Sequence, residues 1–159
     1  MQLFLFLPKL IIFMDTRNII GIIVFDGEKF LLLHRALNWS GWEFPKGGIE
    51  KNELTESALK RELFEETGLK KYELVGKVGE VTFFDNVRNM NGFAQNYLVR
   101  VSSNSKVVLN NEHVLDKAKV IEHDDFKWCL PKEAVRLATH KDTKDSLKKA
   151  FKMLGIEMI

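Results

Sequence analysis

Three glutamates within five positions are the residues whose type and spacing point most directly to chemistry. Glu62, Glu65 and Glu66 follow the i, i+3, i+4 pattern that places side chains on one face of a helix. Carboxylates this close destabilise a helix unless a cation neutralises them, and the dipole at the end of a helix adds to the cost. Hard divalent ions such as Mg2+ or Mn2+ prefer oxygen ligands. The cluster therefore predicts a divalent metal site, with a solvated acidic face as the alternative.

The helix that carries these glutamates is predicted from about 54 to 67, a stretch without glycine or proline. Asn52 or Thr55 would cap its start, and Gly68 suits a left-handed residue at its end. Leu63 is expected to turn away from the acidic face and into the core.

Strands are predicted on both sides of this helix. A β-branched run followed by an Asp-Gly pair indicates a first hairpin. The predicted strands cover residues 19–25, 30–33, 42–44, 78–84, 93–101 and 126–130; Gly47 and Gly48 open a loop, and two further helices cover 132–138 and 144–154. Strands, a helix, strands and then helices indicate an α/β fold whose mixed β-sheet is covered on both faces.

Composition limits the class of protein. A chain of 159 residues with 45% hydrophobic residues fits one domain with its own core. The formal net charge of +2 is too balanced to indicate nucleic-acid binding by itself. The single cysteine, Cys129, excludes an internal disulfide, and four scattered histidines argue against a zinc site. We expect a cytoplasmic protein, monomeric or homodimeric, with no membrane partner.

The first 13 residues are apolar but contain Pro8 and Lys9. The run is shorter than the roughly 20 residues of a membrane-spanning helix, and it lacks the basic start and cleavage site of a secretory signal. Two interpretations stay open: an extra strand or arm that packs on the domain, or a segment upstream of a natural start at Met14. The domain itself is expected over residues 14–159.

Residues 47 to 69 resemble the Nudix box. That pattern is Gly, five residues, Glu, seven residues, then Arg-Glu-aliphatic-x-Glu-Glu-x-Gly-aliphatic. This chain matches it at every fixed position, with Gly47, Glu53 and the run from Arg61 to Leu69. The resemblance implies an α/β/α sandwich and a hydrolase that cleaves the pyrophosphate bond of a nucleoside diphosphate derivative. Metal ions would screen the phosphates, orient them and activate water.

The resemblance also implies roles for individual residues. Four of them provide metal ligands: the carboxylates of Glu62, Glu65 and Glu66 and the backbone carbonyl of Lys46. Arg61 orients Glu53 and Glu65 and does not touch the substrate. The candidate catalytic residues are therefore Glu53, Arg61 and Glu65, together with Glu122 from a second motif.

Two flanking motifs bear on the substrate. WEFPKGG, at 42–48, is similar to the W-x-x-P-K-G segment of diadenosine tetraphosphate hydrolases, with a near match in bacterial RNA pyrophosphohydrolases. EHDDFKW, at 122–128, is similar to the E-H-x-x-aromatic-basic-W segment of the asymmetric diadenosine tetraphosphate hydrolases, in which the loop glutamate is a candidate general base. Here that residue is Glu122. In this segment we favour core packing for Phe126 and Trp128.

Asymmetric hydrolysis of diadenosine tetraphosphate is the first expectation for the reaction. An RNA 5′-pyrophosphohydrolase is the main alternative, and a basic, aromatic-lined groove would favour it. A nucleoside triphosphate or nucleotide-sugar pyrophosphatase is another. A module that senses a nucleotide without cutting it is disfavoured, because such modules usually lose box glutamates and this chain retains them all.

Candidate substrate contacts lie around the box and on the later strands: His34, Arg35, Lys46, Gly47, Gly48, Phe84, Gln95 and Tyr97. A surface charge is the alternative for the basic residues, and core packing is the alternative for the aromatic ones. Related dinucleoside polyphosphate hydrolases often carry a lysine just before the position of Tyr97. This lysine is absent here, and Gln95 would bind a phosphate oxygen more weakly than a charged residue would. Glu80 is a further candidate carboxylate.

Overall fold

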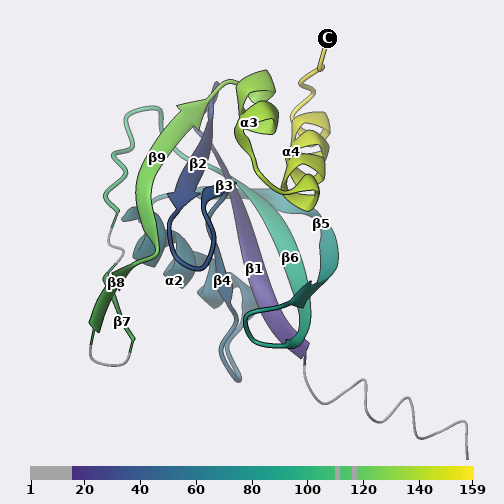
Figure 1. The fold of residues 1–159 in the computed structure, drawn as a ribbon. Coiled ribbons are helices and arrows are strands. Elements are labelled where there is room, and N and C mark those ends of the chain that lie inside the picture. Colours follow the sequence, from purple (N-terminus) through teal and green to yellow (C-terminus); the bar gives the residue numbers. More distant parts are fainter. Residues whose placement is uncertain (1–15, 110–111, 116–117) are drawn as a thin grey trace, which may run out of the picture.

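A seven-stranded mixed sheet forms the centre of the computed structural model, which describes residues 16–109, 112–115 and 118–159 (Figure 1). The order is β3-β2-β1-β6-β5, with β4 paired to β1 and β9 paired to β2; β1 and β6 run parallel and the other pairs run antiparallel. The strands are β1 Thr16–Phe25, β2 Phe30–Arg35, β3 Gly41–Glu43, β4 Lys46–Gly48, β5 Glu73–Asp85, β6 Met90–Arg100 and β9 His123–Cys129. The arm predicted at residues 1–13 lies outside the described residues.

Helices cover both faces of this sheet (Figure 1). They are α2 Thr55–Thr67, α3 Pro131–Leu137 and α4 Lys141–Met153. Strand β1 alternates between the layers: Ile20 and Ile22 pack with α2, whereas Ile23 and Phe25 pack with α3 and α4. This arrangement confirms the predicted α/β/α sandwich with a mixed sheet. None of the helices in the described part of the chain is long and apolar enough to cross a membrane.

Helix α2 begins without the predicted side-chain cap. Its N-cap is Leu54, and no side chain bonds to the free backbone N–H groups there. Thr55 is already helical, and Asn52 lies in the preceding turn with φ of 62°. The two predicted caps were therefore wrong, because each falls one or more positions away from the true boundary.

The end of α2 agrees with the sequence. Gly68 has φ of 71°, and its N–H donates to the Phe64 carbonyl at 2.8 Å. Leu63 is fully buried in the cluster between α2 and the sheet. These two residues fix both the length of the helix and its rotation, and with this rotation Glu62 and Glu66 contact strand β4.

Two further differences concern the loops. Gly47 and Gly48 belong to β4, where they pair with Ile20 and Ile19, whereas a loop was expected. A second sheet, formed by β7 Glu112–Leu115 and β8 Ala118–Ile121, was not predicted. Both strands are only a few residues long and mix polar with apolar positions, so they carry little alternation to detect.

Candidate active site

The last turns of α2 bring two box glutamates into a buried position beside β4. Glu62 and Glu66 are only 8% and 6% exposed, whereas the Glu65 side chain is 54% exposed. The Lys46 backbone N–H donates to Glu66 Oε2 at 3.1 Å. A Cβ atom at Gly47 would collide with the Glu62 carboxyl group, so any side chain there would displace that carboxyl group or β4. Strand β4 therefore lies directly against the carboxylates of the helix.

Arg61 makes the contacts to acidic residues that the sequence predicted for it. Its Nε and Nη2 donate to the two oxygens of Glu53 at 2.7 and 2.8 Å. Its Nη1 donates to Glu62 at 2.6 Å and to Glu65 at 3.2 Å, and Nη2 also donates to the Gly48 carbonyl. Arg61 lowers the pKa of Glu53 to about 2, with help from the Glu50 backbone N–H. Arg61 thus joins β4, the preceding turn and α2.

Glu122, from the junction of β8 and β9, lies close to the end of α2. Ligand atoms of Glu66, Glu122 and His123 all lie within 4.8 Å of one another. Burial raises the pKa of Glu66 well above its ordinary value, and the nearby charges of Glu122, Glu62 and Glu43 raise it further. A divalent cation would offset that repulsion, so the donor set fits such an ion. His123 was not anticipated, because one histidine carries no metal-site spacing.

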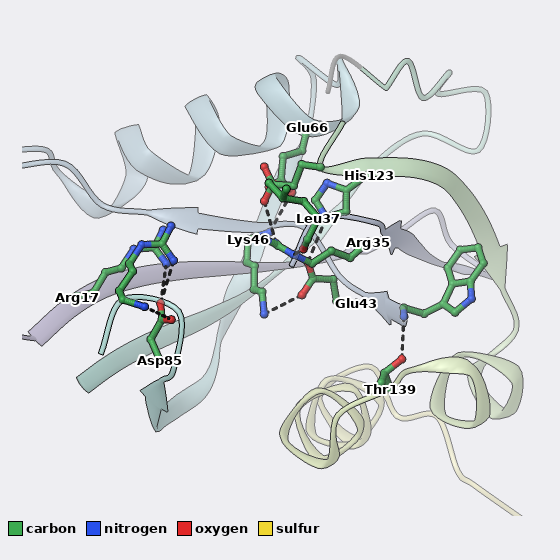
Figure 2. Close-up of polar contacts among 12 residues, drawn as sticks. Arg17, Arg35, Leu37, Glu43, Lys46, Glu66, Asp85, His123 and Thr139 are labelled. Atoms are coloured by element: carbon green, nitrogen blue, oxygen red, sulfur yellow. Dashed lines mark hydrogen bonds and ion pairs between the residues drawn. The ribbon is translucent and has the colours of Figure 1, made fainter. Parts of the chain in front are cut away.

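Beside this group lies a buried carboxylate that the sequence reading also missed. Glu43 is 1% exposed, and its Oε2 forms an ion pair with Lys46 Nζ at 2.7 Å. Its Oε1 contacts Arg35 Nη1 at 3.2 Å and His123 Nε2 at 3.1 Å, as Figure 2 shows. Burial raises the pKa of Glu43, but the contacts with His123, Lys46 and Arg35 outweigh it and lower the pKa to about 2. The sequence did carry one signal for Glu43, because it is a charged residue within the short and otherwise apolar predicted strand at 42–44.

Arg35 and Lys46, two of the predicted phosphate contacts, place their cationic groups over the ring of Trp39. We call these three residues the basic wall. The Arg35 guanidinium carbon lies 5.8 Å from the Trp39 ring centre, and Lys46 Nζ lies 6.0 Å from it. Arg35 Nη1 also donates to Glu122 at 2.8 Å. The basic wall therefore combines an aromatic ring and two cations that lie beside the carboxylates of Glu43 and Glu122.

His34, the third predicted phosphate contact, is held by other side chains. Its Nδ1 lies 2.6 Å from Asp124 Oδ1, and its Nε2 lies 3.3 Å from Ser40 Oγ. Its ring also meets the edge of Trp42 at 5.1 Å between centres. His34 is therefore oriented by its neighbours at the base of the loop between β2 and β3.

A family comparison matches residues 15–151 to the NUDIX domain. The chain belongs to the NUDIX family. The RNA pyrophosphohydrolase of Bartonella bacilliformis is 29% identical over 148 residues, covering 78% of this chain and 85% of that protein. That of Campylobacter jejuni is 32% identical over 107 residues, covering 62% of this chain and 64% of that protein. Membership of this family confirms the enzyme class that the motif predicted, a Nudix pyrophosphohydrolase.

Solved structures confirm the Nudix fold. A Caenorhabditis elegans Ap4A hydrolase complex superposes with a TM-score of 0.69 at 22% identity, covering 87% of this chain and 98% of that one. The Escherichia coli dihydroneopterin triphosphate pyrophosphohydrolase gives 0.68 at 17% identity, covering 83% of this chain and 92% of that one. At such identities the likeness shows the architecture alone.

The other predicted contacts, Phe84, Gln95 and Tyr97, lie on strands β5 and β6 of the Nudix domain. The Tyr97 ring packs on the core beneath α2, and its hydroxyl donates to Gln95 at 3.1 Å. Phe84 is 53% exposed near the β5–β6 turn, and Glu80 pairs with Lys77 on β5. Neither Phe84, Gln95 nor Tyr97 is among the described residues that line the small cavity beside Lys46.

Strand β6 faces that cavity with a different residue. The cavity, about 30 Å³ in volume, is lined by Glu43, Lys46 and Asn96, among others. Asn96 is 4% exposed and its Nδ2 donates to Ser146 Oγ at 3.0 Å. Because side chains alternate along a strand, Gln95 faces the α2 layer, whereas Asn96 faces α4. Asn96 is therefore the side-chain amide of this strand that faces the cavity, and Gln95 stays a prediction as a substrate contact.

The two aromatic residues of β9 also differ from each other. Trp128 packs on the α2 side of the core, in line with the interpretation as core packing. Phe126 is 36% exposed, so that interpretation was wrong for this residue.

Proposed function

We propose that this Nudix domain hydrolyses the pyrophosphate bond at the 5′ end of an RNA, with Mg2+ or Mn2+ as cofactor. The basic wall of Arg35 and Lys46 on Trp39 carries this proposal. Proteins bind single-stranded RNA by stacking bases on aromatic rings and guanidinium planes. The cations of the wall suit the 5′ phosphates, and the wall lies next to the acidic group. The relatives named RNA pyrophosphohydrolase support the same substrate.

Cations would be held by the carboxylates of Glu62, Glu65 and Glu66 and by the backbone carbonyl of Lys46. When bound, they supply Lewis acidity and neutralise the charge of the phosphate chain. Glu66 is the best placed of these residues, because it is buried at the meeting point of α2, β4 and the Glu122 junction. Glu65 is more exposed and would complete the site from its solvent side.

The remaining residues of the site position the substrate and move the proton. Glu122 accepts the proton of the attacking water, since its carboxylate lies beside Glu66 at the edge of the acidic group. Arg61 holds Glu53 and keeps Glu62 and Glu65 in place. Lys46 and Arg35 hold phosphate oxygens, with the backbone of Gly47 and Gly48 alongside.

Asymmetric hydrolysis of diadenosine tetraphosphate is the second candidate. The FPKGG segment around Lys46 and the E-H-x-x-F-K-W segment favour this reaction, which was the first expectation from the sequence. We rank it second because residues 94–96 offer no lysine to a longer phosphate chain. Nucleoside triphosphates and nucleotide sugars are the remaining alternatives. The cytoplasmic setting and the monomeric or homodimeric state stay predictions.

A substrate panel tests the proposal. Purified protein is incubated with Mg2+ and, in separate reactions, a 5′-triphosphorylated oligoribonucleotide, diadenosine tetraphosphate, nucleoside triphosphates and nucleotide sugars. Mass spectrometry in oxygen-18 water identifies the products and the phosphorus that is attacked. The proposal expects the highest kcat/KM on the oligoribonucleotide, with 5′-monophosphate RNA as product. A higher kcat/KM on diadenosine tetraphosphate would move the second candidate to first place.

A further inference from the structure

Glu43 contacts three groups of the site at once, although it lies outside the Nudix box. It joins Lys46 on β4, Arg35 on β2 and His123 on β9. We propose that Glu43 is a positioning residue, which holds the proton acceptor Glu122 beside Glu66 through the shared guanidinium of Arg35. This inference rests on the proposed function, since it takes Glu122 as the base.

The guanidinium of Arg35 is the link between the two carboxylates. A single nitrogen, Nη1, lies 3.2 Å from Glu43 Oε1 and 2.8 Å from Glu122 Oε1. The Nε of Arg35 donates to the Leu37 carbonyl at 3.0 Å, which fixes the other edge of the plane. Arg35 is only 14% exposed at its side chain. With one edge fixed and little free volume, the guanidinium transmits the position of Glu43 to Glu122.

The backbone of Glu122 is held by the same loop. Its carbonyl accepts hydrogen bonds from the Ala36 N–H at 2.8 Å and the Leu37 N–H at 3.4 Å. The pairing of β2 with β9 is irregular at this point, because Arg35 pairs with His123 whereas His34 pairs with Asp125. Such bulges re-aim side chains near active sites. The backbone therefore brings Glu122 close to Glu66. The Arg35–Glu43 pair then sets the position of the Glu122 carboxylate.

His123 provides a second connection from Glu43 to the same junction. Its Nε2 lies 3.1 Å from Glu43 Oε1, the oxygen that also contacts Arg35. Both side chains are 1% exposed. One buried oxygen of Glu43 thus contacts both His123, which follows Glu122 in the chain, and Arg35, which pairs with the Glu122 carboxylate.

Replacing Glu43 by glutamine separates a positioning role from a general structural one. The amide keeps the volume but removes the charge that holds Arg35 and Lys46. Glu122 would lose its fixed position, so kcat falls. The Lys46 ammonium would become free to meet phosphate, so KM stays equal or decreases. A loosened fold would instead raise KM and lower the melting temperature.

The experiment is a double-mutant cycle with Glu43→Gln and Glu122→Gln, measured as kcat and KM at saturating Mg2+ on the best substrate of the panel. We expect Glu43→Gln to reduce kcat by roughly 10–100-fold in the wild-type background, the usual cost of losing a residue that orients a ligand. In the Glu122→Gln background it should cost less than about threefold. Mn2+ binding measured by calorimetry should stay within about threefold of wild type, because the α2 carboxylates are untouched.

Two controls keep the test sharp. Glu133→Gln removes a carboxylate that pairs with Lys127 of β9 at 2.6 Å, and it should leave kcat unchanged. Arg35→Lys keeps the charge but loses the Nε–H that fixes the guanidinium to the Leu37 carbonyl. It should therefore reproduce the fall in kcat in the wild-type background and not in the Glu122→Gln background, and this holds as a test even if Glu43→Gln fails to fold.

The outcomes distinguish this inference from the proposed function. Equal losses from Glu43→Gln in both backgrounds, or a rise in KM with kcat kept, overturn the positioning role alone. Wild-type activity in Glu122→Gln would show that Glu122 is not the base, and the positioning role of Glu43 would then be overturned as well. A wild-type protein that turns over nothing in the panel overturns the proposed function and this inference together.

Discussion

Arg61 and Glu53 form a two-point ion pair, with Nε and Nη2 of the arginine at 2.7 and 2.8 Å from the two carboxylate oxygens. The pair spans the turn before α2 and the middle of that helix. It keeps the arginine in place to reach Glu62 and Glu65 with its remaining nitrogen. The positions of the Glu62 and Glu65 carboxylates therefore depend on the Arg61–Glu53 pair, which does not have to contact the substrate itself.

The first prediction concerns stability against pH. Arg61 and the Glu50 N–H lower the pKa of Glu53 to about 2 in the folded state, from an ordinary value of 4.5. A lowered folded-state pKa stabilises the fold above the ordinary value and loses that effect as pH falls through the folded value. Wild type should therefore be more stable than Glu53→Gln at neutral pH, and the gap should narrow between about pH 4.5 and pH 2. Chemical denaturation across this range measures it; a gap that does not change with pH contradicts the assignment.

The second prediction concerns the proton acceptor. Glu122→Gln should slow hydrolysis by roughly 10²–10⁴-fold, the usual contribution of a general base, with the fold unchanged. Single-turnover rates at saturating Mg2+ measure the chemical step. A decrease below about threefold would return Glu122 to the role of an ordinary loop charge.

The third prediction uses the glycine of the box. Gly47→Ala places a methyl group against the Glu62 carboxyl, so either β4 or the carboxylate must move. We expect a loss of turnover of at least about tenfold, in line with displaced ligand-orienting groups, and weaker Mn2+ binding. The matched control is Gly79→Ala on β5, where the nearest atom is Lys149 Nζ at 3.5 Å, an ordinary contact. If both variants retain full activity, Gly47 is not required for the site.

The box and the fold could be predicted from the sequence because they depend on local patterns. The glutamate spacing, Leu63 and Gly68 lie within one helix, where periodicity places each side chain. The caps at Asn52 and Thr55 failed because several nearby residues could start the same helix, and only tertiary packing selects one.

The network around Glu43 could not be predicted in the same way. Glu43 and His123 are 80 positions apart, and their contact depends on the pairing of β9 with β2. The place of Asn96 beside Lys46 is hidden in the sequence for a related reason, and Gln95 stays a predicted substrate contact. Strand β6 is covered on both faces, so its sequence does not show which residues face the cavity beside Lys46.

The central claim is that the carboxylates at the end of α2 bind a divalent cation, and calorimetric titration with Mn2+ or Mg2+ tests it most directly. Glu66→Gln should keep the fold, because it removes a buried charge whose pKa is already raised. Glu133→Gln is the matched control and should bind like wild type. We predict saturable binding to wild type and at least about tenfold weaker binding to Glu66→Gln, together with the loss of metal-dependent turnover. No binding to wild type, or equal binding to wild type and Glu66→Gln, would contradict the account.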